Sequence, residues 1–187
     1  MTELIRNPRA MKKAQEEVRV LLGSKGKVDE EDIHQLQYLK SVVKETLRLH
    51  SPVPLLLPRE AIQHCKIAGY DILPNTRLFI NAWGIGRDPK TWDAAEEFIP
   101  ERFVDSPLDF KGHDFQFIPF GSGRRICPAM FTGVLMIELA LANMLYSFDW
   151  KLPAGMRKED IDMNDAPGIT VHKRSVLPLV AVKHVIK

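Results

Sequence analysis

Apolar and polar positions along the first part of the chain have the spacing of an amphipathic helix. Asn7 followed by Pro8 predicts an N-cap and the first residue of a helix, and Gly23 predicts its end. Between them runs one apolar stripe at intervals of three to four residues. Its members are Met11, Ala14, Val18, Leu21 and Leu22.

A second stripe follows the polar connector 24–32 and predicts a second helix, which Pro52 ends. Its apolar positions are Ile33, Leu36, Leu39, Val43 and Leu47. Together the two stripes predict a helical pair that buries its apolar faces in one core.

The pattern changes near residue 59. β-favouring residues in 64–72 and 76–83 surround turn residues and predict short strands. Residues 87–103 read as a turn-rich coil with one helical turn, and 159–165 as acidic coil. Two last strands are expected in 168–173 and 177–183. No linker divides the chain, so we expect one mainly α unit with small β-sheets.

The most apolar stretch is 130–148, which is long enough to span a bilayer. Glu138 lies near its middle, and a carboxylate there costs on the order of 3 kcal/mol in membrane insertion. We therefore predict a buried core helix from about 129 to 146 rather than a membrane span. The N-terminal residues lack the apolar segment of a signal peptide.

Composition excludes several function classes. The net charge of +2 and the scattered basic residues argue against nucleic-acid binding. Two cysteines, Cys65 and Cys127, are too few for a disulfide-stapled secreted fold and are expected to be reduced thiols. They lie too far apart for a structural zinc site, and the six histidines show no metal-ligand spacing.

The candidate chemistry lies in residues 117–130, FIPFGSGRRICPAM. Neither glycine-rich phosphate-binding motif fits this stretch. Cys127 precedes Pro128, where we place the start of the apolar helix, and a helix N-terminus favours a thiolate. Arg125 offers a bidentate cation to a carboxylate, and the glycines allow close approach of a ligand. These features suit a metal cofactor with carboxylates, such as haem, and a buried structural cysteine remains the alternative.

The neighbouring residues resemble the haem-binding signature of the cytochrome P450 family, F-x-x-G-x-R-x-C-x-G. Here Phe120, Gly123, Arg125 and Cys127 match, and Ala129 stands where the family has its last glycine. Two further family motifs appear in order: E-x-x-R at residues 45–48 and P-E-R-F at 100–103. The segment LRLHSPVPLLLPRE, residues 47–60, is similar to the plant microsomal branch. The resemblance covers essentially the whole chain.

The resemblance implies the C-terminal, haem-proximal part of the cytochrome P450 fold, with 1–187 one portion of a single domain. Cys127 would be the axial thiolate of haem b, with Phe120 near the sulfur and Arg125 and Arg59 on the propionates. Taken alone, Arg59 reads equally as a surface residue. Further haem-lining positions would be Gly121, Gly123, Ile126 and Ala129. Glu45, Arg48 and Arg102 would form a structural network. The substrate-lining positions would be Val53, Leu55, Leu56, Gly168 and Ile169.

Taken alone, Glu45 and Arg48 at i,i+3 would more simply be a solvated ion pair. The resemblance further implies a monooxygenase that inserts one oxygen atom from O2 into a small apolar substrate, such as a plant specialised metabolite. Electrons would come from NADPH through a reductase, at the cytosolic face of the endoplasmic reticulum membrane. Neither the family's N-terminal anchor nor its acid–threonine helix appears in this chain. The alternative is a non-catalytic remnant that binds haem or a partner without oxygen activation.

Overall fold

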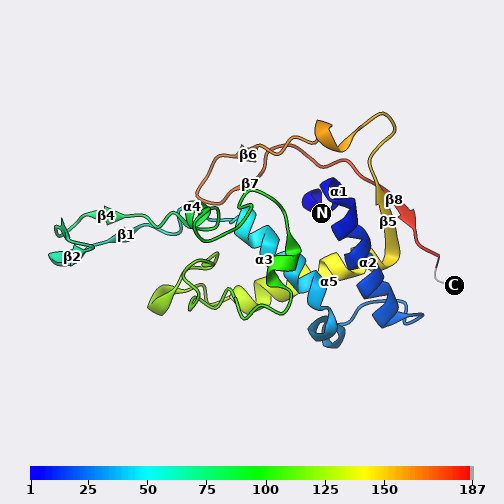
Figure 1. The fold of residues 1–187 in the computed structure, drawn as a ribbon, viewed down its shortest axis with the longest axis horizontal. Coiled ribbons are helices and arrows are strands. Elements are labelled where there is room, and N and C mark those ends of the chain that lie inside the picture. The colour runs from blue at the N-terminus through cyan, green and yellow to red at the C-terminus, as the bar shows by residue number, and fades with distance from the viewer. Residues whose placement is uncertain (186–187) are drawn as a thin grey trace.

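The computed structural model describes residues 1–185, which form a helical core with four two-stranded sheets. Helices α3 and α5 lie at the centre, and α2 packs against both (Figure 1). The prediction of a mainly α unit with small sheets is therefore confirmed. The α-helices are α1 (Thr2–Arg6), α2 (Pro8–Leu22), α3 (Gln37–Leu49), α4 (Ala82–Ile85) and α5 (Met130–Ser147). The 3-10 helices are η1 (Glu30–Gln35), η2 (Pro100–Phe103), η3 (Gly123–Arg125) and η4 (Lys158–Asp160).

Helix α2 begins at Pro8 and ends before Gly23, as predicted. Four members of the predicted stripe are buried, whereas Leu21 is exposed. Leu21 lies about 100° around the helix from Leu22, at the edge of the apolar face. The Asn7 side chain does not cap α2, because it donates a hydrogen bond to the carbonyl of Glu3 instead.

The predicted second helix is two helices, η1 and α3, separated at Leu36. Ile33 and Leu36 are buried as predicted, but the backbone of Leu36 is not helical. The break has a cause outside this segment. The carboxylate of Glu17 on α2 accepts hydrogen bonds from the backbone N–H groups of Tyr38 and Leu39, at 2.7 and 2.9 Å. A side chain from a neighbouring helix therefore satisfies the free donors that start α3.

All four sheets are antiparallel pairs: β1 with β4, β2 with β3, β5 with β8, and β6 with β7. The first two pairs lie in one long hairpin that extends from the helical body (Figure 1). Strands β2, β3 and β4 fall in the predicted strand regions, although the end of 76–83 turns into α4. Sequence patterns missed β1, β5 and β6. The bounds are β1 (Arg59–Glu60), β2 (Cys65–Ile67), β3 (Tyr70–Ile72), β4 (Arg77–Leu78), β5 (Phe148–Lys151), β6 (Asp165–Ala166), β7 (His172–Lys173) and β8 (Val180–Lys183).

Helix α5 differs from the predicted range by one residue at each end. By length and composition this helix could cross a membrane: its mean hydropathy is 1.4, and one third of its 18 residues are buried. Val134, Leu141 and Leu145 belong to the hydrophobic core, as expected of a core helix. Its other side exposes apolar Met136 and Ile137.

Glu138 on α5 is 7% exposed and makes no hydrogen bond or ion pair within residues 1–185. Burial raises the pKa of this carboxyl, assisted by Asp109 and opposed by Lys40 and Lys44. The pKa of Glu138 is thus higher in the folded than in the unfolded chain. The contribution of this carboxyl to stability is therefore complete below its pKa in the unfolded chain. It is lost as the pH rises through its pKa in the folded chain. We expect Glu138→Gln to abolish this decline in the free energy of unfolding, measured by urea unfolding from about pH 4 to about pH 8.

The matched control for this prediction is Glu16→Gln, because Glu16 is an exposed carboxylate on α2. The control should keep the pH profile of the wild-type chain. A Glu138→Gln profile parallel to that of the wild type would show that this carboxyl does not cause the decline.

Candidate functional site

The loop before α5 closes on itself and holds Cys127 at its end. The backbone N–H of Cys127 donates to the carbonyl of Phe120 at 3.0 Å, and that of Ile126 donates to Gly123 at 3.1 Å. Gly121 and Gly123 have φ angles of +79° and +71°, which L side chains rarely adopt. The thiol of Cys127 is free and half-buried, whereas Cys65 is exposed on the distant hairpin.

The placement of Cys127 at a helix start was wrong by two residues. Helix α5 begins at Met130 with Ala129 as its N-cap, and Pro128 lies in a turn. The first helical hydrogen bond runs from Gly133 to the carbonyl of Ala129. Cys127 therefore precedes the N-cap. Because the effect of the helix dipole falls off within about one turn of the helix end, the dipole favours a thiolate at Cys127 less than the sequence indicated.

A second glycine supports the loop from the side. A Cβ atom on Gly112 would lie 2.8 Å from Cδ1 of Ile126 and 3.0 Å from the carbonyl oxygen of Gly121. The hydroxyl of Ser122 donates to the carbonyl of Gly112 at 2.5 Å. Sequence reasoning missed Gly112, because a lone glycine in a coil gives no sign of what packs against it.

Arg59, from a distant part of the chain, lies beside this loop, which itself carries Arg125. Arg59 Nη2 donates to the carbonyl of Arg125 at 3.5 Å. Neither guanidinium forms an ion pair with a carboxylate in the described part of the chain. A Cβ on Gly123 would meet nothing within 4 Å, so the space beside Gly123 is open. A half-buried thiol, open space and two unpaired cations fit a flat metal cofactor that carries carboxylates.

Ala129 has a φ of −98°, so the backbone here does not require glycine. Its methyl group is exposed. The phenyl ring of Phe120 packs edge-on against Phe110, with ring centroids 5.6 Å apart. The bulk of Phe120 thus closes one side of the loop against the core.

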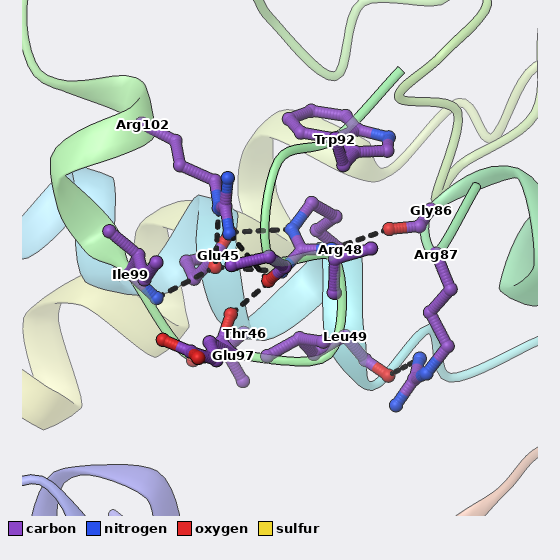
Figure 2. A network of polar contacts seen from close by, with 12 residues as sticks. Glu45, Thr46, Arg48, Leu49, Gly86, Arg87, Trp92, Glu97, Ile99 and Arg102 are labelled. Atoms are coloured by element: carbon purple, nitrogen blue, oxygen red, sulfur yellow. Dashed lines mark hydrogen bonds and ion pairs between the residues drawn. The ribbon is translucent and has the colours of Figure 1, made fainter. Parts of the chain in front are cut away.

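Glu45 and Arg48 form a buried ion pair, with side chains 0% exposed (Figure 2). Arg48 Nε and Nη2 donate to the two oxygens of Glu45 at 2.7 and 2.8 Å. Arg102 Nε lies 3.3 Å from Glu45 Oε1, so the structure brings the three predicted network residues together. The solvated ion pair that i,i+3 spacing suggests does not describe this geometry.

The network joins α3 to the coil before η2. Arg48 Nη1 donates to the carbonyls of Gly86 and Ala95, and the N–H of Ile99 donates to Glu45 at 2.8 Å (Figure 2). The guanidinium also lies 5.1 Å from the ring centroid of Trp92. The charges are thus matched by hydrogen bonds on every side, which is the condition under which buried ions persist.

A cavity of about 990 Å³ lies between α1, α3, α5 and the segment 163–174. Of the residues predicted to line the substrate, Leu55 and Gly168 line this cavity, and Val53, Leu56 and Ile169 are not among its lining residues. Leu56 lies on the side of the cysteine loop instead, with Cδ1 3.9 Å from where a Cβ of Gly121 would be. Residues 53–57 therefore connect the cavity to the cysteine loop.

Sequence reasoning also missed an acid–base pair on the cavity wall. His50 Nε2 lies 2.8 Å from Glu3 Oε1, which ties α1 to the end of α3. Burial opposes the ionisation of Glu3, but its hydrogen bond with His50 and the charges of His50 and Arg6 outweigh burial and lower the pKa of Glu3. The two residues lie 47 positions apart, so no local pattern could have linked them.

Comparisons with known proteins bear on the family and the fold of this chain. The family model "Cytochrome P450" matches residues 1–179. Cytochrome P450 71A1 of Persea americana is 59% identical over 184 residues, covering 98% of this chain and 37% of that protein. Cytochrome P450 71D10 of Glycine max is 56% identical, covering 97% and 36%. A zebrafish cytochrome P450 solved with abiraterone superposes with a TM-score of 0.85 at 26% identity, covering 97% and 41%. This chain thus spans somewhat over a third of the length of its relatives.

Proposed function

Because this chain belongs to the cytochrome P450 family and resembles its plant 71-type members, we propose that it is the haem-binding portion of a haem-thiolate monooxygenase. The observation that carries the proposal is the loop at Cys127, which holds a free thiol, has open space at Gly123, carries Arg125 and has the guanidinium of Arg59 beside it. Residues 1–187 would form one part of a single domain, because the helices share one core.

In this proposal Cys127 binds the iron of haem b, and Arg59 and Arg125 bind the propionates. Haem held by a cysteine thiolate supplies the activation of molecular oxygen. The chain's own residues position the ligand: the carbonyl of Phe120 accepts the N–H of Cys127 and fixes the direction of the loop. The remaining haem-lining positions would be Gly121, Gly123, Ile126 and Ala129.

The substrate would be a small apolar molecule, such as a plant specialised metabolite. The apolar side chains of the cavity support this, among them Leu55, Val42 and Leu141. Of the predicted substrate-lining residues, Leu55 and Gly168 are the better supported, and Val53, Leu56 and Ile169 depend on the family pattern. Electrons would come from NADPH through a reductase at the cytosolic face of the endoplasmic reticulum membrane, as in plant microsomal members of the family.

A carbon-monoxide spectrum of the reduced, haem-loaded chain tests the ligand assignment. The wild-type chain should show the red-shifted Soret band of a thiolate ligand, and Cys127→Ser should lose it. Cys65→Ser is the matched control, since it removes an exposed thiol far from the loop and should leave the band in place. A band that survives in Cys127→Ser would refute the assignment.

A further inference from the structure

Helix η2 is attached to α3 at a second point besides the Glu45 network. Tyr38 is buried in the first turn of α3, and its hydroxyl donates to Glu101 Oε1 at 3.1 Å. Glu101 directly precedes Arg102, whose side chain reaches Glu45 seven residues further along α3. The two contacts therefore fix η2 along two turns of α3, and only one of them involves the network described above.

A cation completes this second attachment. Lys13 Nζ on α2 lies 3.4 Å from Glu101 Oε1 and 4.1 Å from the ring centroid of Tyr38. The more exposed Arg9 lies 3.9 Å from the same oxygen. Burial and the charge and hydrogen bond of Glu101 raise the pKa of Tyr38. Burial opposes the ionisation of Glu101, yet its hydrogen bonds to backbone, Tyr38 and Lys13 lower its pKa. At neutral pH a neutral phenol thus donates to a carboxylate.

The orientation of η2 is transmitted to the cysteine loop by aromatic packing. Phe103, the last residue of η2, is buried with its ring centroid 5.0 Å from that of Phe117. Phe117 is 2% exposed and lies three residues before Phe120. The carbonyl of Phe120 in turn accepts the N–H of Cys127. Since cores are packed to near-crystal density, a rotation of η2 displaces this row of side chains.

We propose that Tyr38 and Glu101 are a positioning pair for Cys127, which they hold in place through η2, Phe103 and Phe117. The functional meaning of this pair rests on the proposed function, because Cys127 matters as a haem ligand. The structural role of the pair does not depend on that function, because the order of the cysteine loop can be measured without haem.

The test is the rate at which Cys127 is alkylated by iodoacetamide under native conditions, with Cys65→Ser present in every variant. Tyr38→Phe removes only the hydroxyl, and we expect alkylation to be faster by about three- to tenfold, the net scale of one typical hydrogen bond. Glu101→Ala should accelerate alkylation by the same factor as Tyr38→Phe. Glu101→Gln keeps an acceptor oxygen and should have the smaller effect. Tyr70→Phe, at an exposed tyrosine of the hairpin, should change nothing.

Val18→Ala separates positioning from general loss of stability. Val18 is fully buried on α2 and lies outside the path from Tyr38 to Cys127. Alkylation at the wild-type rate in Tyr38→Phe would overturn the proposal. The proposal would also be overturned if Val18→Ala, at the same free energy of unfolding as Tyr38→Phe, accelerated the alkylation of Cys127 equally.

In the haem-loaded chain, Tyr38→Phe should also lower the fraction of protein that shows the thiolate Soret band. A wild-type chain without that band would refute the proposed function, while alkylation still decides the role of Tyr38.

Discussion

Replacing Arg48 by methionine should lower the free energy of unfolding by about 3–5 kcal/mol, the usual cost of removing one partner from a buried ion pair. Methionine retains the apolar part of the side chain but leaves Glu45 as a carboxylate at 0% exposure. It also removes the donors that satisfy the carbonyls of Gly86 and Ala95. Urea unfolding followed by circular dichroism measures the loss.

Two comparisons make this result specific. Lys12 forms an exposed i,i+4 pair with Glu16, and Lys12→Ala should cost at most about 0.5 kcal/mol. Changing Glu45 to leucine together with Arg48→Met removes both buried charges and should recover a large part of the stability. If Arg48→Met costs no more than Lys12→Ala, Glu45 and Arg48 do not form the buried pair described here.

Replacing Gly112 by alanine should cost about 2–4 kcal/mol and should displace the cysteine loop. The φ of +81° at Gly112 is unfavourable for alanine, and the added Cβ would meet Ile126 and the backbone of Gly121. The backbone atoms cannot yield as a flexible side chain would. We therefore expect both a lower urea midpoint and faster alkylation of Cys127.

Gly155→Ala is the matched control for this second effect. Gly155 has almost the same φ, +83°, but a Cβ there would meet nothing within 4 Å. Its substitution should cost about 1–2 kcal/mol from backbone strain and leave the alkylation rate of Cys127 unchanged. Equal effects of the two substitutions, on stability and on alkylation, would show that nothing packs tightly against Gly112.

Local patterns predicted the elements whose causes are local. The apolar run of α5 and the Asn-Pro and Gly signals of α2 placed those helices to within two residues. The break at Leu36 could not be predicted, because the carboxylate that starts α3 comes from Glu17 on another helix. The late start of α5 depends on the turn at Pro128 and Ala129, whereas the sequence favours proline at the first helical position.

The same distinction holds for the candidate site. Motif order pointed to Cys127, Glu45 and Arg48 because their residue types and spacing are specific. The contributions of Gly112 and Tyr38 depend on long-range contacts: Gly112 touches a loop around ten residues away, and Tyr38 meets Glu101 across 63 residues. Spacing along one chain does not encode such contacts. Their discovery required the tertiary arrangement of α3, η2 and the cysteine loop.

X-ray absorption at the iron edge of the haem-loaded chain tests most directly whether the sulfur of Cys127 binds iron. We predict one sulfur atom in the first coordination shell of the ferric iron, present in the wild-type chain and in Cys65→Ser and absent in Cys127→Ser. A shell of nitrogen and oxygen alone in the wild-type chain, or a sulfur that remains in Cys127→Ser, would contradict the account.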